Sequence, residues 1–321
     1  MESRALDIFL GSLKTDSTKK NYLYWLDRYM EDNKFTSYDE LASQTPEKIQ
    51  TDIENYVMNL KRMRSTKAMV SATVYSLFHF FAMNRVILNE KIIKKLLPEQ
   101  ELKVGGAAYS TEDIRKIILA IDDTKIKKHK RWYYRKPLSK ALVLTLASSG
   151  MRLGAIPDLQ YQDLEPIEDT YSIRVYARTR HEYITFITPE ARLALDDYLT
   201  KLKLKPDTCF FGLNYDALRL SLYRLVKKAK VSTVTVHELT RLDKEWNPHI
   251  KNPRHRLDIP TVHGMRKRWN TILKSDSTIN TNLIELMLGH TAIRLDEAYL
   301  KPTREILFNE YKKGITALTV F

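Results

Sequence analysis

The sequence predicts a mainly α-helical protein with two domains and a small β-sheet or hairpin in the second. The chain has 321 residues, and at roughly 150 residues per domain this length suggests two domains. Through the first hundred positions, apolar residues recur at three- and four-residue steps, the spacing of one helix face. Two short β-prone runs, at residues 171–176 and 183–187, flank a polar stretch and predict strands.

The first domain, expected at residues 1–97, consists of helices. Ser17 or Thr18 can cap the first helix, and Pro46 marks another helix start, because proline is favoured at the first helical position. Aromatic side chains at helical spacing in this domain are expected to form its core. The predicted helices cover about residues 17–30, 45–60, 65–84 and 89–97.

Residues 98–108 are expected to link the two domains, because this stretch contains Gly105-Gly106 and has no apolar face. Ser110 to Asp113 then resembles a capping box that opens a helix, so the second domain is expected at residues 109–321. The polar stretch 231–260 predicts an insertion or long loops. Further helices are expected at 138–149, from Thr188 onward, and at 214–230, 263–274, 279–288 and 303–311.

The composition indicates a protein that meets a polyanion. Lys and Arg number 53 against 39 Asp and Glu, which gives a net charge of +14, and nucleic acid is the usual partner of so basic a chain. A basic surface that serves only solubility is the alternative.

Cys209 is the only cysteine, so no intrachain disulfide can form and an intracellular protein is expected. No signal peptide and no run of about 20 apolar residues is present, which predicts a protein outside the membrane.

Five side chains of the second domain together suit phosphodiester chemistry: Arg152, His263, Arg266, His290 and Tyr299. Arginine can hold a phosphate through two parallel hydrogen bonds and stays charged at any working pH. Histidines can exchange protons, and a tyrosine can act as a nucleophile when its neighbours assist it. Each residue also has an ordinary structural interpretation, as a solvated helix face, a helix cap or a packing residue. The order and spacing of the whole set favour the chemical interpretation.

This set resembles the signature of the tyrosine recombinases, the integrase family that includes Xer-like, phage and archaeal-virus enzymes. Residues Ser149 to Leu153 resemble its first box, with Arg152 as the first arginine. His263 to Arg266 resemble the H-x-x-R of the second box, and Leu288 to His290 resemble the L-G-H motif. Tyr299 stands where the family has its nucleophile.

The resemblance implies a helical core-binding domain followed by a mixed α+β catalytic domain, over nearly the whole chain. It implies that Tyr299 attacks the scissile phosphate, forms a 3′-phosphotyrosyl bond and releases a 5′ hydroxyl. The 5′ hydroxyl of a partner DNA then reverses the reaction. Since the bond energy is retained in the intermediate, the resemblance implies neither metal, nor ATP, nor any other cofactor. In agreement, no P-loop and no metal-ligand spacing occurs in the sequence.

Two positions depart from the family pattern. The family usually has a lysine in the β-hairpin after the first box, but here Arg178 stands there and no lysine occurs between residues 163 and 199. Because arginine is a reluctant proton donor, we expect Arg178 to stabilise the leaving oxygen electrostatically while water or another residue supplies the proton; Arg180 is the alternative. Ala155 stands where the family commonly has an acidic residue.

Basic clusters in both domains predict the surface that contacts DNA. Residues 125–140 contain eight Lys or Arg and no acid, interleaved with three aromatic residues. Such a run can neutralise phosphates, although a solvated loop is the alternative. Two basic domains joined by a linker could close around a duplex. The residues expected to bind DNA, including the first-domain cluster, are Arg62, Arg64, Lys67, Lys128, Lys130, Arg131, Arg135 and Arg180.

The leading interpretation is a site-specific DNA recombinase or integrase, with double-stranded target sites as partners and a cytoplasmic location in a prokaryotic or viral host. The family resemblance also implies self-association into a tetramer on DNA, with the residues after Tyr299 docked on a neighbouring subunit; packing of that tail on its own domain is the alternative. Two other functions stay open. One is a DNA-relaxing topoisomerase with the same tyrosine chemistry, and the other is a catalytically weak, DNA-binding architectural relative.

Overall fold

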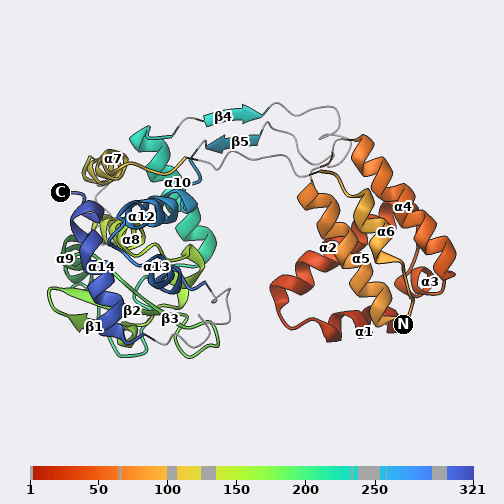
Figure 1. Cartoon of the computed structure of the whole chain (residues 1–321), viewed down its shortest axis with the longest axis horizontal. Helices are drawn as coiled ribbons and strands as arrows, with labels where there is room; N and C mark the ends of the chain where they lie inside the picture. Colours follow the sequence, from red (N-terminus) through yellow and green to blue (C-terminus); the bar gives the residue numbers. More distant parts are fainter. Residues whose placement is uncertain are drawn as a thin grey trace. The chain divides into compact units, whose positions relative to one another are not determined.

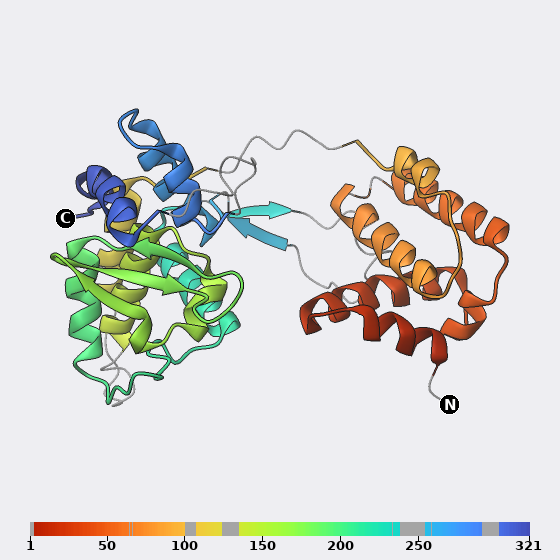
Figure 2. The ribbon, with the colours of Figure 1, turned by 60° about the horizontal axis from the view of Figure 1, so that its bottom comes forward.

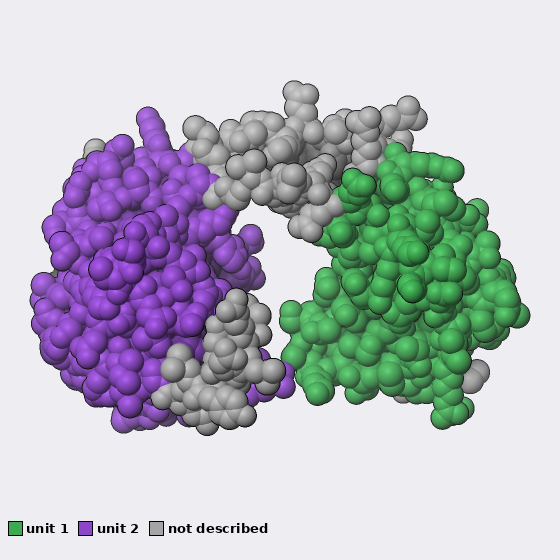
Figure 3. Space-filling model, in the orientation of Figure 1, with its two compact units in different colours: residues 1–104 green, residues 105–321 purple. Residues whose placement is uncertain are grey.

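Helices dominate both halves of the chain in the computed structural model, which is drawn in Figure 1. The chain divides into two compact units, Met1–Val104 and Gly105–Phe321, coloured separately in Figure 3. The structure describes residues 3–63, 65, 67–99, 107–123, 135–232, 234–237, 254–257, 259–290 and 302–321.

The helices of unit 1 pack their apolar faces together around α5. Leu26 and Tyr29 of α2, Val57 of α4, and Leu77 and Phe81 of α5 are buried. Two short helices, α1 and α3, were not predicted, because the apolar spacing of so few residues is a weak signal. The elements are α1 (Arg4–Ser12), α2 (Asp16–Asn33), α3 (Tyr38–Ala42), α4 (Pro46–Arg62), α5 (Lys67–Met83) and α6 (Glu90–Leu96).

Unit 2 contains helices and a small antiparallel sheet. Local capping decides several helix starts, two of them as the sequence predicted: Ser110 and Asp113 form a reciprocal capping box, and Thr188 caps a helix that has Pro189 in its first turn. The predicted cap of α2 at Ser17 or Thr18 is wrong, because Thr15 accepts the Thr18 backbone N–H and the helix begins at Asp16. The described elements are α7 (Thr111–Asp122), α8 (Arg135–Ser149), η2 (Leu153–Asp158), η3 (Tyr161–Asp163), β1 (Leu164–Ile167), β2 (Thr170–Val175), β3 (Tyr183–Phe186), α9 (Pro189–Leu199), α10 (Tyr215–Ala229), β4 (Val234–His237), β5 (Arg254–Leu257), α12 (His263–Ser275), α13 (Thr281–Met287) and α14 (Arg304–Leu318).

The three strands β1, β2 and β3 form one sheet in that order, shown in green in Figure 2. Both pairs are antiparallel, and Ile173 in the central strand lies opposite Leu164 on one side and Thr185 on the other. The predicted hairpin is therefore the β2–β3 pair, and β1 adds a strand that the sequence pattern did not reveal. The mainly α-helical fold class with a small sheet is confirmed.

Helix α8 is the centre of unit 2. All residues from Ala141 to Ser149 are buried, with α7, α9 and α12 packed around the helix. An all-round buried helix shows little amphipathic spacing, which agrees with the continuous apolar run in the sequence. This burial fixes the carboxyl end of α8, from which the first motif follows.

The C-terminal helix α14 packs on unit 2 itself. Leu307, Phe308 and Tyr311 are buried, and the Tyr311 hydroxyl donates to the Ser148 carbonyl oxygen at 2.8 Å. Of the two arrangements considered for the tail, the structure has the helix on its own domain.

One part of residues 231–260 departs from the expectation of loops. Strands β4 and β5 pair antiparallel, with Val234 opposite Leu257 and His237 opposite Arg254. The β-branched run at residues 234–236 is a strand signal that is easily missed within a polar region. None of the helices in the described part of the chain combines the length and apolar character needed to cross a bilayer.

Candidate active site

Three separate segments of unit 2 bring four of the predicted residues to one place. Arg152 follows α8 and precedes η2, in extended backbone. His263 and Arg266 lie in the first turn of α12, as their three-residue spacing predicted. His290 follows the end of α13. The fifth predicted residue, Tyr299, lies outside the described residues.

Arg266 connects the three motif segments through its guanidinium. Its Nη1 donates to the Gly150 carbonyl oxygen at 2.7 Å, and its Nη2 donates to the Leu288 carbonyl oxygen at 2.8 Å. The same Nη2 lies 3.0 Å from Nε2 of His290. The side chain that is expected to bind phosphate is thus also held by the protein backbone on two sides, which limits its motion.

Two positive charges meet at this point. Arg152 Nη1 approaches the Leu288 carbonyl oxygen at 3.5 Å, so both guanidiniums face the same carbonyl. Burial and, after it, the positive charge of Arg152 lower the pKa of Arg266 from its ordinary value. Adjacent like charges repel, and an anion bound between them relieves that repulsion. The pair is therefore suited to a group such as a phosphate.

Tyr183 of β3 lies close to both guanidiniums and was not among the sequence predictions. Burial raises the pKa of its phenol, while the positive charges of Arg266 and Arg152 act in the opposite direction. Its ring also packs against Gly289, which has a φ of +67° and leaves no room for a side chain. The glycine of the L-G-H motif is thus required both by its backbone angle and by this contact. Nothing in the local sequence pattern of β3 marks Tyr183 as part of the site.

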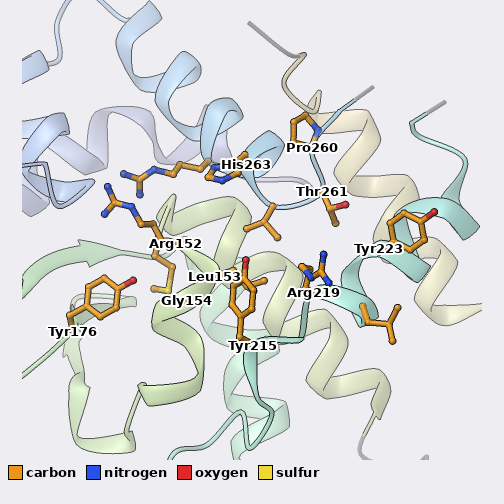
Figure 4. A pocket seen from close by; sticks show the side chains of 14 residues that line it. Arg152, Leu153, Gly154, Tyr176, Tyr215, Arg219, Tyr223, Pro260, Thr261 and His263 are labelled. Atoms are coloured by element: carbon orange, nitrogen blue, oxygen red, sulfur yellow. The ribbon is translucent and has the colours of Figure 1, made fainter. Parts of the chain in front are cut away.

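His263 is exposed and lines a cavity of about 580 Å³ together with Arg152 and Arg266. In Figure 4, Arg152 and His263 lie on one side of this cavity, and Tyr215, Arg219 and Tyr223 of α10 lie on another. The α10 residues were also missed. Their four-residue spacing, which places an arginine between two tyrosines on one helix face, is a signal that the sequence does contain.

Arg178 is held by a buried carboxylate. Its Nη1 and Nη2 donate to the two oxygens of Asp163 at 2.7 and 3.1 Å, and the side chain of Asp163 is only 2% exposed. The hydrogen bonds to Asp163 raise the pKa of Arg178. Arg178 does not line the cavity described above. The alternative residue, Arg180, is exposed, with its Nε 3.1 Å from Nε2 of His181.

The second departure from the family pattern, Ala155, lies in the packed core. Ala155 is 2% exposed and belongs to the core of unit 2. A carboxylate at this position would have to be buried, which is costly without a paired charge. Among the described residues, no group of His, Cys, Asp and Glu side chains is arranged to hold a metal ion.

Four of the eight residues predicted to bind DNA lie in the part of the chain that the structure describes. Arg62, Lys67, Arg135 and Arg180 are exposed. Arg64, Lys128, Lys130 and Arg131 lie outside the described residues.

Comparison with known proteins shows which fold this geometry belongs to. No protein-family model matches the chain. The tyrosine recombinase XerA of Saccharolobus solfataricus is 24% identical over 203 residues, which is 63% of this chain and 59% of that relative. The Tn1549 transposon integrase in complex with circular intermediate DNA has a TM-score of 0.59 at 15% identity, over 96% of this chain and 99% of that one. The chain has the tyrosine recombinase fold.

Two further solved structures have a similar fold. XerH in its post-cleavage complex with a palindromic difH substrate has a TM-score of 0.56 at 14% identity, over 91% of this chain and 78% of that one. A lambda integrase dimer bound to a COC′ core site has a TM-score of 0.53 at 15% identity, over 94% and 97% of the two chains. The family resemblance predicted from the three motifs is confirmed.

Proposed function

We propose that this chain is a site-specific DNA recombinase or integrase that breaks and rejoins DNA through a 3′-phosphotyrosyl bond to Tyr299. The observation that carries the proposal is the convergence of Arg152, Arg266 and His290 from three segments on one point beside an open cavity. The relatives named above, which include DNA-bound recombinases and integrases, support the same reaction class.

In the proposed reaction, Arg152 and Arg266 hold the non-bridging oxygens of the scissile phosphate, where negative charge grows in the transition state. Tyr299 attacks the phosphorus, and the 5′ oxygen leaves. We propose that His263 and His290 exchange protons with the attacking and leaving oxygens. No metal or nucleotide enters this scheme, because the covalent intermediate keeps the bond energy for rejoining.

Arg178 remains our predicted stabiliser of the leaving oxygen. Its pairing with Asp163 occupies two N–H groups, and a guanidinium has five. Replacing Arg178 with alanine is expected to slow cleavage strongly, and cleavage at the wild-type rate would remove this residue from the reaction.

We further propose that the substrate is duplex DNA contacted by both domains, which we place at residues 1–97 and 109–321 with a linker between them. The exposed basic residues Arg62, Lys67, Arg135 and Arg180, together with the net charge of +14, support a DNA surface. Lambda integrase forms a tetramer on a Holliday junction, and we propose that this chain also assembles as a tetramer on DNA.

A pool of duplexes with randomised sequence and one central nick tests the reaction. Cleavage beside the nick releases a short strand and traps the covalent complex, which can be isolated under denaturing conditions and sequenced. We expect an adduct at the DNA 3′ end that is lost in Tyr299→Phe. An enzyme that also exchanges strands between two duplexes is a recombinase, whereas relaxation of supercoiled plasmid alone indicates a topoisomerase. DNA binding without any adduct would refute the proposal in favour of an architectural protein.

A further inference from the structure

Glu285 joins two elements of the candidate active site through its side chain. It lies on α13, five residues before His290, and its carboxylate contacts both Lys274 Nζ on α12 and Nδ1 of His290. The Glu285 carbonyl oxygen also accepts the His290 backbone N–H at 3.0 Å. His290 is therefore attached to Glu285 through both its backbone and its imidazole ring.

The two nitrogens of the His290 ring have different partners. Nε2 lies 3.0 Å from Nη2 of Arg266. Because a guanidinium only donates hydrogen bonds, Nε2 must be the acceptor in this contact, and the ring proton must lie on Nδ1. Nδ1 then donates to Glu285, which is an acceptor in its charged form. One arrangement of protons satisfies all three groups.

Lys274 keeps Glu285 in the form that this arrangement needs. Partial burial raises the pKa of Glu285, but hydrogen bonds from Lys274 and His290 outweigh it and leave the pKa below its ordinary value. Among the described residues, the charged groups that contact this pair are Lys274 on α12 and, across the ring, Arg266. The carboxylate is thus ionised near neutral pH and oriented toward the ring.

We propose that Glu285 is a positioning residue that fixes the tautomer and the orientation of His290, so that Nε2 accepts from Arg266. Lys274 holds the carboxylate of Glu285 from the opposite side. The catalytic consequence rests on the proposed function, whereas the tautomer does not. A partner of this kind, which hydrogen-bonds the far nitrogen of a functional histidine, fixes which nitrogen carries the proton.

The tautomer can be measured directly in the full-length protein without any DNA. Histidine ring ¹⁵N shifts, with the signal of His290 identified by its loss in His290→Asn, report which nitrogen is protonated. We expect the Nδ1-protonated form in the wild type and a mixture of tautomers in Glu285→Leu. Glu285→Gln keeps an acceptor oxygen and should retain part of the preference. A matched control is Glu168→Leu. Glu168 lies between β1 and β2, and its carboxylate pairs with Lys312 of α14 at 2.7 Å. An unchanged His290 tautomer in Glu285→Leu would overturn the proposal.

The catalytic consequence is tested with the nicked duplex selected above. Glu285→Leu is expected to slow adduct formation by about 10- to 100-fold, by analogy with the loss of a residue that orients a metal-binding histidine. Glu285→Gln should recover part of the rate, and Glu168→Leu should leave it unchanged.

A double-variant comparison separates positioning from a general loss of structure. If Glu285 acts through His290, Glu285→Leu causes no further loss in a His290→Ala background. A full loss in that background would contradict the proposal. Absence of an adduct in the wild type would refute the proposed function, while the ring ¹⁵N measurement would still decide the role of Glu285.

Discussion

Replacing Gly289 with alanine is expected to destabilise unit 2, because two separate costs fall on this position. The backbone of Gly289 has a φ of +67°, a left-handed conformation that L-residues rarely adopt. A β-carbon there would lie 2.5 Å from Cε1 of the Tyr183 ring and closer still to Cδ1. Tyr183 lies beside Arg152 and Arg266, so displacing its ring would also disturb the predicted phosphate site.

The two costs can be given separate magnitudes. The left-handed conformation costs an alanine about 1–2 kcal/mol. Overpacking against a ring that cannot move freely costs about 1–3 kcal/mol more. The free energy of unfolding should therefore fall by about 2–5 kcal/mol in Gly289→Ala.

Gly212 provides a matched control for this prediction. It also has a positive φ, +57°, but a β-carbon on it would meet no atom within 4 Å, so Gly212→Ala should show only the backbone cost of about 1–2 kcal/mol. Urea titration of the full chain, followed by circular dichroism, measures both variants against the wild type. If Gly289→Ala is no less stable than Gly212→Ala, the prediction that the Tyr183 ring adds an overpacking cost at Gly289 is wrong.

Four other outcomes are expected. Arg266→Lys should slow adduct formation about 100-fold, since removing one donor aimed at the developing charge costs about 3 kcal/mol; single-turnover cleavage measures it. Tyr311→Phe should lower the free energy of unfolding by about 1–2 kcal/mol, because the buried hydroxyl that bonds the Ser148 carbonyl is lost; equal urea midpoints would contradict this. The Glu285 pKa is lowered in the folded chain, so its contacts with Lys274 and His290 stabilise the fold above the ordinary carboxyl pKa and lose this effect as pH falls through the lowered value. The difference in urea midpoint between wild type and Glu285→Gln should thus shrink at acid pH. A difference that does not change with pH would argue against stabilisation by the ionised Glu285. Finally, the logarithm of DNA affinity should fall steeply and linearly with the logarithm of salt concentration. An affinity that does not change with salt in a binding titration would exclude phosphate contacts as the main source of DNA binding.

Most helices of this protein could be predicted because their signals are local. The capping box at Ser110 and Asp113 and the Thr188-Pro189 start lie within a few residues of the helices they open, and both are present in the structure. The elements that were missed have weaker local signals. Helix α3 has five residues, and β1 has four residues with no clear alternation of burial.

The candidate site was predictable as a set of residues but not as an arrangement. The sequence contains Arg152, His263, Arg266 and His290 in the family order, and this order alone implied that they meet. It did not indicate that Tyr183 lies beside Arg152 and Arg266 or that Glu285 contacts the imidazole of His290. These contacts join residues on different elements, and no rule of spacing connects them.

Arg178 illustrates the same limit. The sequence places it at the position where the family usually has a lysine, which implied a role at the leaving oxygen. The structure adds the partner, Asp163, which lies 15 residues earlier in the chain and is buried beneath the hairpin. That pairing depends on how η3 packs against β2, and the local sequence of the hairpin carries no information about it.

The sequence by itself determined the mainly helical fold class, several helix starts and the five-residue motif set, because caps, apolar spacing and motifs act over short stretches of chain. The tertiary structure alone decided which backbone carbonyls hold Arg266, which nitrogen of His290 faces it, and where Arg178 is directed. Those features arise when segments more than a hundred residues apart, such as Gly150 and Arg266, are packed to hydrogen-bonding distance. Only the packed core fixes such distances, since a motif specifies residue types and their order but not the bonds between them.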